Sequence, residues 1–112
     1  MEEIKIVEKV WGHEEWIVNT SNYCGKKLLL KKDYQSSLHY HRTKDETFYV
    51  DEGKVLLELN SQKIIMNPGD AQRILPNQIH RFSGLKDSVI LEFSTEHNEN
   101  DVVRLEESRK VN

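Results

Sequence analysis

Short runs of apolar and β-branched residues alternate with turn-forming residues along most of the chain. The run at residues 26–32 is typical, because Cys24-Gly25 precedes it and Asp33-Tyr34 follows it. A run of this length between turn signals is too short for a helix and predicts a strand. The same reasoning predicts further strands at residues 4–7, 15–19, 36–41, 46–51, 54–59, 63–66, 71–75, 80–83 and 88–94.

The turns between these strands recur roughly every 8–12 residues or less, which is the spacing of an all-β sandwich or barrel. The sequence has no alternation of strands with helices, no internal repeat and no low-complexity segment. Residues 10–13 look like a bend. Only residues 96–110 could form a helical turn, and the stretch 101–105 within them is better interpreted as an extended arm. The pattern therefore predicts an all-β fold.

Length and composition narrow the class of protein. A chain of 112 residues is near the commonest domain size, so we expect a single domain over residues 1–112. Hydrophobic residues make up 37% of the chain and charged residues 31%, which argues against a disordered or membrane protein. A net charge of −3 without a long basic run gives no general attraction to nucleic acid.

Two features bear on the compartment. Cys24 is the only cysteine, which excludes an intramolecular disulfide and fits a reducing compartment. The N-terminal sequence Met-Glu-Glu-Ile lacks the basic and then apolar pattern of a signal peptide. We therefore expect a cytoplasmic protein without a membrane partner.

Three histidines and one glutamate have the spacing of a metal site. Residues two apart on a strand point to the same face, so His39 and His41 extend side by side into one pocket. Glu46 begins the next strand, and a hairpin turn at residues 42–45 is expected to bring its carboxylate back towards the two imidazoles. His80 comes from elsewhere in the fold as the fourth ligand. This set of donors suits one divalent metal ion, which is Zn, Mn, Fe or Ni.

The same residues carry a resemblance to a known family. The pattern His39-x-His41-x4-Glu46-x6-Gly53 resembles the first motif of the cupin family, and Gly69, Pro76 and His80 resemble the second motif. This resemblance implies a double-stranded β-helix, the cupin jelly-roll barrel, with the metal inside one mouth of the barrel.

Nearly the whole chain is also similar to the cupin domain of mannose-6-phosphate isomerases of the type fused to mannose-1-phosphate guanylyltransferase. This narrower likeness rests on residues 11–14, 37–46 and 101–107. Two positions depart from the expected patterns. His39 stands where the isomerases often have Gln, and Asn77 stands where the second cupin motif usually has Gly, although asparagine can also adopt a positive φ.

The isomerase resemblance implies a metal-dependent sugar or sugar-phosphate isomerase or epimerase. In such an enzyme the metal polarises the sugar carbonyl and holds adjacent hydroxyls, while a base moves a proton between two carbons. The sequence assigns no catalytic base, and Tyr49, Gln72 and Lys31 are weak candidates. His13 and His97 are left out of the site because neither has a suitably spaced partner.

Cationic and aromatic residues near the motifs are the candidate substrate contacts. A phosphate needs cations, and Lys44 and Arg104 match charged positions of the isomerase motifs, while Arg73 neighbours the second cupin motif. Phe48 and Phe82 each lie two residues beyond a candidate metal ligand. Because alternate residues of a strand share a face, both phenylalanines are expected to face the metal.

Two other functions fit the same barrel. One is a non-enzymatic sugar-binding module, and the other is an iron-dependent dioxygenase, since three histidines and a glutamate also suit iron. The partner expected from the resemblance is a small-molecule sugar or sugar phosphate. A homodimer is also expected, because the N-terminal strand and residues 101–106 present sheet edges that need cover.

Overall fold

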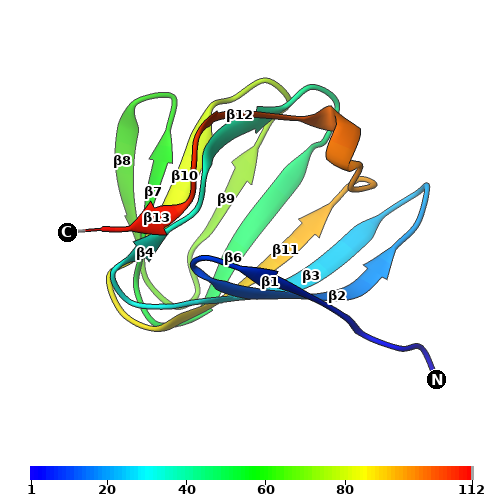
Figure 1. The fold of residues 1–112 in the computed structure, drawn as a ribbon, viewed down its shortest axis with the longest axis horizontal. Helices are drawn as coiled ribbons and strands as arrows, with labels where there is room; N and C mark the ends of the chain where they lie inside the picture. Colours follow the sequence, from blue (N-terminus) through cyan, green and yellow to red (C-terminus); the bar gives the residue numbers. More distant parts are fainter. Residues whose placement is uncertain (112) are drawn as a thin grey trace.

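The structure, a computed structural model, describes residues 1–111 as a succession of short strands (Figure 1). The all-β fold expected from the sequence is confirmed. The elements are β1 (Lys5–Lys9), β2 (Gly12–Asn19), β3 (Cys24–Leu30), β4 (Tyr34–Gln35), β5 (Leu38–His41), β6 (Glu46–Glu52), β7 (Val55–Leu59), β8 (Gln62–Met66), β9 (Ala71–Ile74), β10 (His80–Gly84), β11 (Ser88–Ser94), the 3₁₀ turn η1 (Glu99–Asp101), β12 (Val102–Glu106) and β13 (Arg109–Lys110).

Across residues 1–111 the strands form two antiparallel sheets that curl around a common interior (Figure 1). One sheet has the strand order β1-β2-β3-β11-β6-β9. In the other sheet, β10 pairs with β7 along one edge and with β5 and β4 along the other. β8 continues this sheet beyond β7, and β12 and β13 continue it beyond β5 and β4. The arrangement is the jelly-roll barrel that the sequence predicts.

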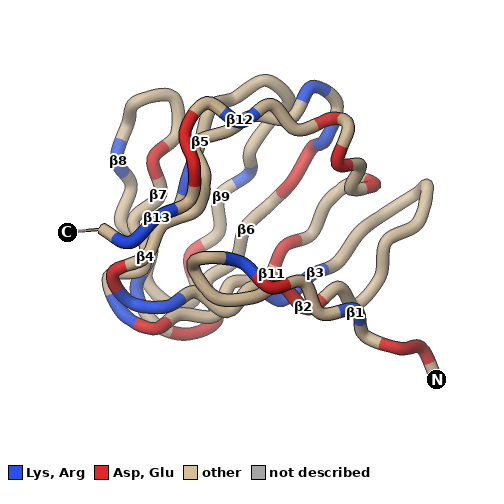
Figure 2. The backbone as a smooth tube through the Cα atoms, viewed as in Figure 1, with Lys and Arg blue, Asp and Glu red and all other residues tan. Residues whose placement is uncertain are grey.

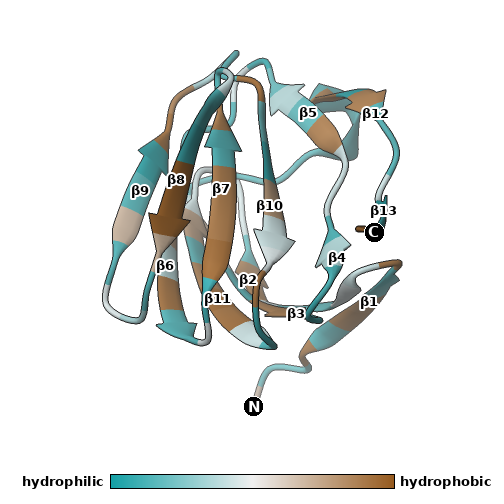
Figure 3. Ribbon diagram, turned by 90° about the vertical axis from the view of Figure 1, so that its left-hand side faces the viewer, coloured by the Kyte–Doolittle hydropathy of each residue, from teal (hydrophilic) through white to brown (hydrophobic). Residues whose placement is uncertain are grey.

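Alternation of side chains along the strands produces the core between the sheets. In β3, Cys24, Lys26, Leu28 and Leu30 are buried, while the residues between them are partly exposed. Figure 3 shows the hydrophobic stretches of β7 and β8 in brown. A fully buried Leu or Ile contributes about 1.5–3 kcal/mol relative to an exposed one, so the buried apolar side chains between the two sheets contribute most to the stability. The buried apolar cluster consists of Trp11, Leu28, Leu30, Phe48, Val50, Val55, Leu57, Leu59, Met66, Ile74, Phe82 and Ile90.

The connection between β5 and β6 differs from the expected hairpin. β5 belongs to one sheet and β6 to the other, so residues 42–45 pass from sheet to sheet. Asp101 fixes this passage, because its carboxylate accepts hydrogen bonds of 2.9–3.1 Å from the backbone N–H groups of residues 42–44. The hairpin prediction was wrong because turn residues mark a change of direction without specifying which strand will be the partner.

The strand predicted at residues 36–41 is divided into β4 and β5. Ser36 and Ser37 lie between them, and both are buried. The backbone N–H of Ser36 donates to the carbonyl of Phe82, and the Ser36 hydroxyl accepts from the Phe82 N–H. A side chain thus replaces one backbone partner of β10 at the break, which hydrophobic periodicity does not reveal.

Two further predictions, at residues 10–13 and 101–105, can be compared with the structure. Gly12 and His13, expected in a bend, already belong to β2, so the turn lies at Val10 and Trp11. The extended arm expected at residues 101–105 is confirmed as β12, which pairs with β5.

Two turns with positive φ support the strands that carry the motifs. Gly53 has φ 91°, and a Cβ there would lie 2.3 Å from the Ser88 hydroxyl oxygen, so only glycine fits. Asn77 has φ 70°, as its place in the second motif requires. The N–H of Asn77 donates to the carbonyl of His41 over 2.7 Å, which joins the second motif to the first.

Acidic and basic positions are interspersed over both sheets (Figure 2), in agreement with the small net charge of −3. Within residues 1–111, no helix has the length and apolar character needed to cross a membrane.

Candidate metal centre

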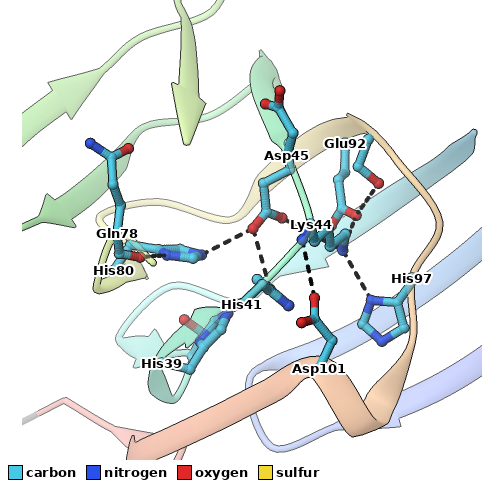
Figure 4. A network of polar contacts seen from close by, with 12 residues as sticks. His39, His41, Lys44, Asp45, Gln78, His80, Glu92, His97 and Asp101 are labelled. Atoms are coloured by element: carbon cyan, nitrogen blue, oxygen red, sulfur yellow. Dashed lines mark hydrogen bonds and ion pairs between the residues drawn. The ribbon is translucent and has the colours of Figure 1, made fainter. Parts of the chain in front are cut away.

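The three predicted histidine ligands come together at one end of the barrel interior (Figure 4), and Glu46 lies beside them. His39 and His80 are Cα partners on neighbouring strands, and His41 lies two residues along from His39. Nitrogen atoms of the three imidazoles all lie within 4.8 Å of one another. Glu46 reaches them from the opposite sheet, with its Oε2 atom 3.3 Å from Nε2 of His41 and 3.3 Å from Nε2 of His80.

Hydrogen bonds set the tautomer of two of these imidazoles. His39 Nδ1 lies 2.9 Å from the carbonyl oxygen of Ser37, and His80 Nδ1 lies 2.9 Å from the carbonyl oxygen of Gln78. Because a carbonyl can only accept, Nδ1 carries the proton in each ring. Each Nε2 then keeps a lone pair directed at the centre, which is the arrangement that orients histidines as metal ligands.

The environment also keeps the rings of His39 and His41 uncharged. Burial, and then the charge of a neighbouring histidine, lowers the pKa of His39 to about 3. Burial, and then the charge of Lys44, lowers the pKa of His41 to about 2. A neutral imidazole is the form that binds metal, so no proton has to be displaced from these rings near neutral pH.

Several polar atoms of the centre have no partner. Among the described residues, Glu46 Oε2, His80 Nε2 and His41 Nδ1 are fully buried and lack a hydrogen bond. Buried polar groups are rarely left unpaired in folded proteins, so these atoms call for a ligand. Three imidazoles with one carboxylate fit a divalent transition metal, which His39, His41, Glu46 and His80 would hold.

Lys44 is buried beside the metal centre, with 2% of its side chain exposed. Its Nζ lies 2.6 Å from Glu92 Oε2, 3.0 Å from His97 Nδ1 and 3.6 Å from Glu46 Oε1. Burial would lower the pKa of Lys44, but the charges of Glu92 and Glu46 outweigh it and raise the pKa to about 12. Lys44 therefore forms an ion pair with the carboxylate of the centre, and two of its three donors are engaged by Glu92 and His97.

A second buried lysine lies near the first. Lys26 Nζ lies 3.4 Å from Glu14 Oε1 and 4.0 Å from the centroid of the Trp16 ring. Trp16 Nε1 donates to the same Glu14 oxygen over 2.7 Å. Lys26 also pairs across the strands with Glu92, and both side chains point inward.

These groups surround a cavity of about 70 Å³. Phe48 and Phe82 form part of its wall, as predicted, with ring centroids 5.7 Å apart and the Phe48 ring 6.1 Å from that of His80. The lining residues are Lys9, Trp11, Glu14, Lys26, Leu28, Ser36, Ser37, His39, His41, Lys44, Glu46, Phe48, Phe82, Glu92, His97, Glu99, Val102, Arg104 and Ser108.

The other candidate contacts are divided between cavity and surface. Arg104 lines the cavity and bonds to Glu99. Arg73 does not line it, because its side chain is 63% exposed and holds Asp45 through bonds of 3.0 and 2.6 Å. The weak base candidates also lie outside the lining of this cavity: Tyr49, Gln72 and Lys31.

Sequence reasoning missed three polar residues of the cavity. His97 was left out of the site, but its ring lies 6.0 Å from that of His41 and contacts Lys44. Glu92 was not considered, and Lys26 was counted only among the cations available to a phosphate, although a signal was present. Both occupy inward positions of alternating strands, where a charged residue needs a buried partner. His97 had no such signal, because it lies in a loop.

A family model described as Cupin domain matches residues 28–94, and the chain belongs to this family. A segment of 44 residues is 39% identical to a quercetin 2,3-dioxygenase of Bacillus subtilis (strain 168). That segment covers 39% of this chain and 13% of the dioxygenase. The cupin resemblance is therefore confirmed, and the narrower resemblance to the isomerase domain stays a prediction.

Solved structures share the fold at low sequence identity. KdgF from Halomonas sp. matches with a TM-score of 0.78 and 20% identity, over 88% of this chain and 90% of that chain. A Streptomyces PAC13 variant with uridine matches with a TM-score of 0.80 and 17% identity, over 98% and 88% of the two chains. These likenesses establish the jelly-roll barrel and leave the reaction open.

Proposed function

We propose that this protein is a metal-dependent cupin that acts on a carbohydrate as a sugar or sugar-phosphate isomerase or epimerase. The observation that carries the proposal is the convergence of the four ligand side chains, three of which have a buried polar atom without a hydrogen bond: Glu46 Oε2, His80 Nε2 and His41 Nδ1. Polar groups able to handle protons surround these ligands in the same cavity. The metal itself would be Zn, Mn, Fe or Ni, since all four accept imidazole and carboxylate donors.

When bound, the metal would act as a Lewis acid that polarises a carbonyl and its adjacent hydroxyl. The protein's own groups would do the rest. Phe48 and Phe82 exclude water from one wall of the cavity. His97 is the proposed proton-transfer group, because it lines the cavity outside the ligand set, and its Nδ1 would exchange the contact with Lys44 for one with the substrate. Its Nε2 donates to Glu99 Oε2 over 3.1 Å, and Glu99 is exposed, which provides a route for a proton to solvent.

The direct test is proton exchange. Metal-loaded protein would be incubated in deuterated water with mannose and fructose, and with their 6-phosphates, and deuterium at the carbon next to the carbonyl would be followed by NMR. We expect deuterium incorporation in the wild type and none in the His41→Ala variant. His97→Gln should retain the metal but exchange at least about a hundredfold more slowly, which is the usual loss for removal of a proton-transfer group. Absence of exchange with all four compounds would contradict the isomerase proposal.

An iron-dependent dioxygenase is the second candidate, and the local identity to quercetin 2,3-dioxygenase is the observation that favours it. Three histidines and a glutamate also suit iron. Iron-loaded protein would be assayed for oxygen uptake with small diols and with quercetin. Oxygen uptake without proton exchange would favour this candidate. Sugar binding without either reaction would favour a non-enzymatic binding module.

We also propose a homodimer of single-domain chains spanning residues 1–112 in the reducing environment of the cytoplasm. Cys24, which is buried as a free thiol, is compatible with that environment. Large apolar side chains on the sheet that contains β1 support the dimer, because Ile6, Ile17 and Phe93 are all about half exposed. Light scattering should give a dimer mass for the wild type and a monomer mass for Phe93→Asp.

A further inference from the structure

The cations that line the cavity are largely neutralised by carboxylates of the same cavity. Lys44 pairs with Glu92, and Lys26 pairs with Glu14. At the opening, Arg104 pairs with Glu99. Within the described residues, Lys9 is the lining cation without an ion pair, and it lies at the end of β1. The cavity walls therefore lack the excess of positive charge that a phosphate-binding pocket needs.

The two buried ammonium groups differ in the number of free hydrogen-bond donors. An ammonium group has three N–H donors. Lys44 uses two of them, at 2.6 Å from Glu92 and 3.0 Å from His97, and lies 3.6 Å from the Glu46 carboxylate, beyond hydrogen-bond distance. Lys26 makes a single hydrogen bond, which is long at 3.4 Å, although its side chain is only 1% exposed. Lys26 therefore keeps more free donors inside the cavity than Lys44, whose ammonium group is also held between two carboxylates.

The position of Lys26 is fixed by its surroundings. The Trp16 ring supports the ammonium group from one side at 4.0 Å, and Trp16 also orients the Glu14 carboxylate through its Nε1. Glu14 and Lys26 are neighbours on β2 and β3, and both line the cavity that contains the metal centre. The Glu14 carboxylate is therefore a fixed hydrogen-bond acceptor next to a fixed donor, the Lys26 ammonium group.

We propose that Lys26 and Glu14 recognise an uncharged, hydroxylated part of the substrate, which lies between them and the metal centre. A hydroxyl group can accept from the ammonium and donate to the carboxylate at once, so it uses the pair without disrupting it. A phosphate in the same place would face the carboxylates of Glu14 and Glu92 at short range and would be repelled. The inference rests on the proposed function, because it assigns a substrate class to the same site.

The test is calorimetric titration of the metal-loaded protein with mannose, fructose and their 6-phosphates. We expect the unphosphorylated sugars to bind at least as tightly as the phosphates. Lys26→Met should weaken sugar binding about tenfold or more, which is the loss expected for a hydrogen bond to a charged group. Glu14→Gln should weaken it less. Lys27→Met is the matched control, because Lys27 is the next residue of β3 and points to the other face of the sheet.

Metal content and melting temperature show whether each variant is folded and loaded. If sugar binding is unchanged in folded, loaded Lys26→Met and Glu14→Gln, the recognition proposal is overturned and the metal-dependent function still stands. If the 6-phosphates bind tenfold tighter than the sugars and Lys9→Met removes that advantage, the ligand is anionic and the proposal is overturned. Sugar binding that depends on Lys26 without proton exchange supports the recognition proposal and contradicts the isomerase.

Discussion

The barrel interior has an apolar end and a charged end built from the same strands. In β3 the inward positions change from Leu28 to Lys26, and in β11 they change from Ile90 to Glu92. The register pairs apolar with apolar and charged with charged residues, because Leu28 lies opposite Ile90 and Lys26 lies opposite Glu92. On β10, His80 and Phe82 make the same change within two residues.

This difference teaches that one alternating pattern can build two kinds of interior. At the apolar end, burial itself stabilises the fold. At the charged end, every buried charge needs a partner, and its desolvation opposes folding. The charged end therefore lowers the stability of the fold. Such a departure is expected at a functional site, and three of the four candidate ligands, His39, His41 and Glu46, line the cavity here.

The largest expected effect comes from breaking a pair at the charged end. Lys44→Met leaves Glu92 buried without its closest partner, so we expect a loss of about 3–5 kcal/mol in the free energy of unfolding. Urea denaturation followed by circular dichroism measures this loss. The double variant Lys44→Met with Glu92→Gln removes both charges and should recover a large part of it. A loss below about 1 kcal/mol in the single variant would contradict the account.

At the apolar end, a truncation should affect stability and leave metal binding intact. Leu57 is 0% exposed, and Leu57→Ala is expected to lower the free energy of unfolding by about 2–5 kcal/mol. The affinity for zinc, measured by competition with a chelating dye, should stay within about twofold of the wild type. A metal affinity that falls together with the stability would mean that the two ends do not act separately.

The ion pair between Lys44 and Glu92 also predicts a dependence of stability on pH. Burial would raise the pKa of Glu92, but the charges of Lys44 and Lys26 outweigh it and lower the pKa to about 2. A carboxyl with a lowered folded pKa stabilises the fold above its unfolded value near 4.5, and this contribution is lost as the pH falls towards 2. Melting temperatures between pH 5 and pH 2.5 should therefore fall more steeply in the wild type than in Glu92→Gln. Parallel curves would remove Glu92 from this role.

Much of the apolar end was readable from the sequence. Strand runs, turn residues and the positive φ of Asn77 follow from local preferences, and the structure confirms them. The spacing of His39 and His41 placed both on one face because a strand has a fixed period. His80 was placed by the family resemblance, since periodicity does not tell which distant strand will be the neighbour.

The charged end was predicted less well because its contacts join residues far apart in the sequence. Lys44 was predicted to contact a phosphate, but Glu92 from another strand neutralises it in the interior. His97 reaches the cavity from a loop. Asp101 directs residues 42–45 to the opposite sheet. Long-range partners of this kind are fixed by the tertiary fold, and no local pattern records them.

The most direct test of the central claim is the metal content of purified protein and of one ligand variant, measured by plasma mass spectrometry after loading and gel filtration. The account predicts close to one divalent metal ion per wild-type chain and almost none in His41→Ala, with both proteins showing the same circular dichroism spectrum. A full complement of metal in a folded His41→Ala protein, or none in the wild type under every metal tried, would contradict it.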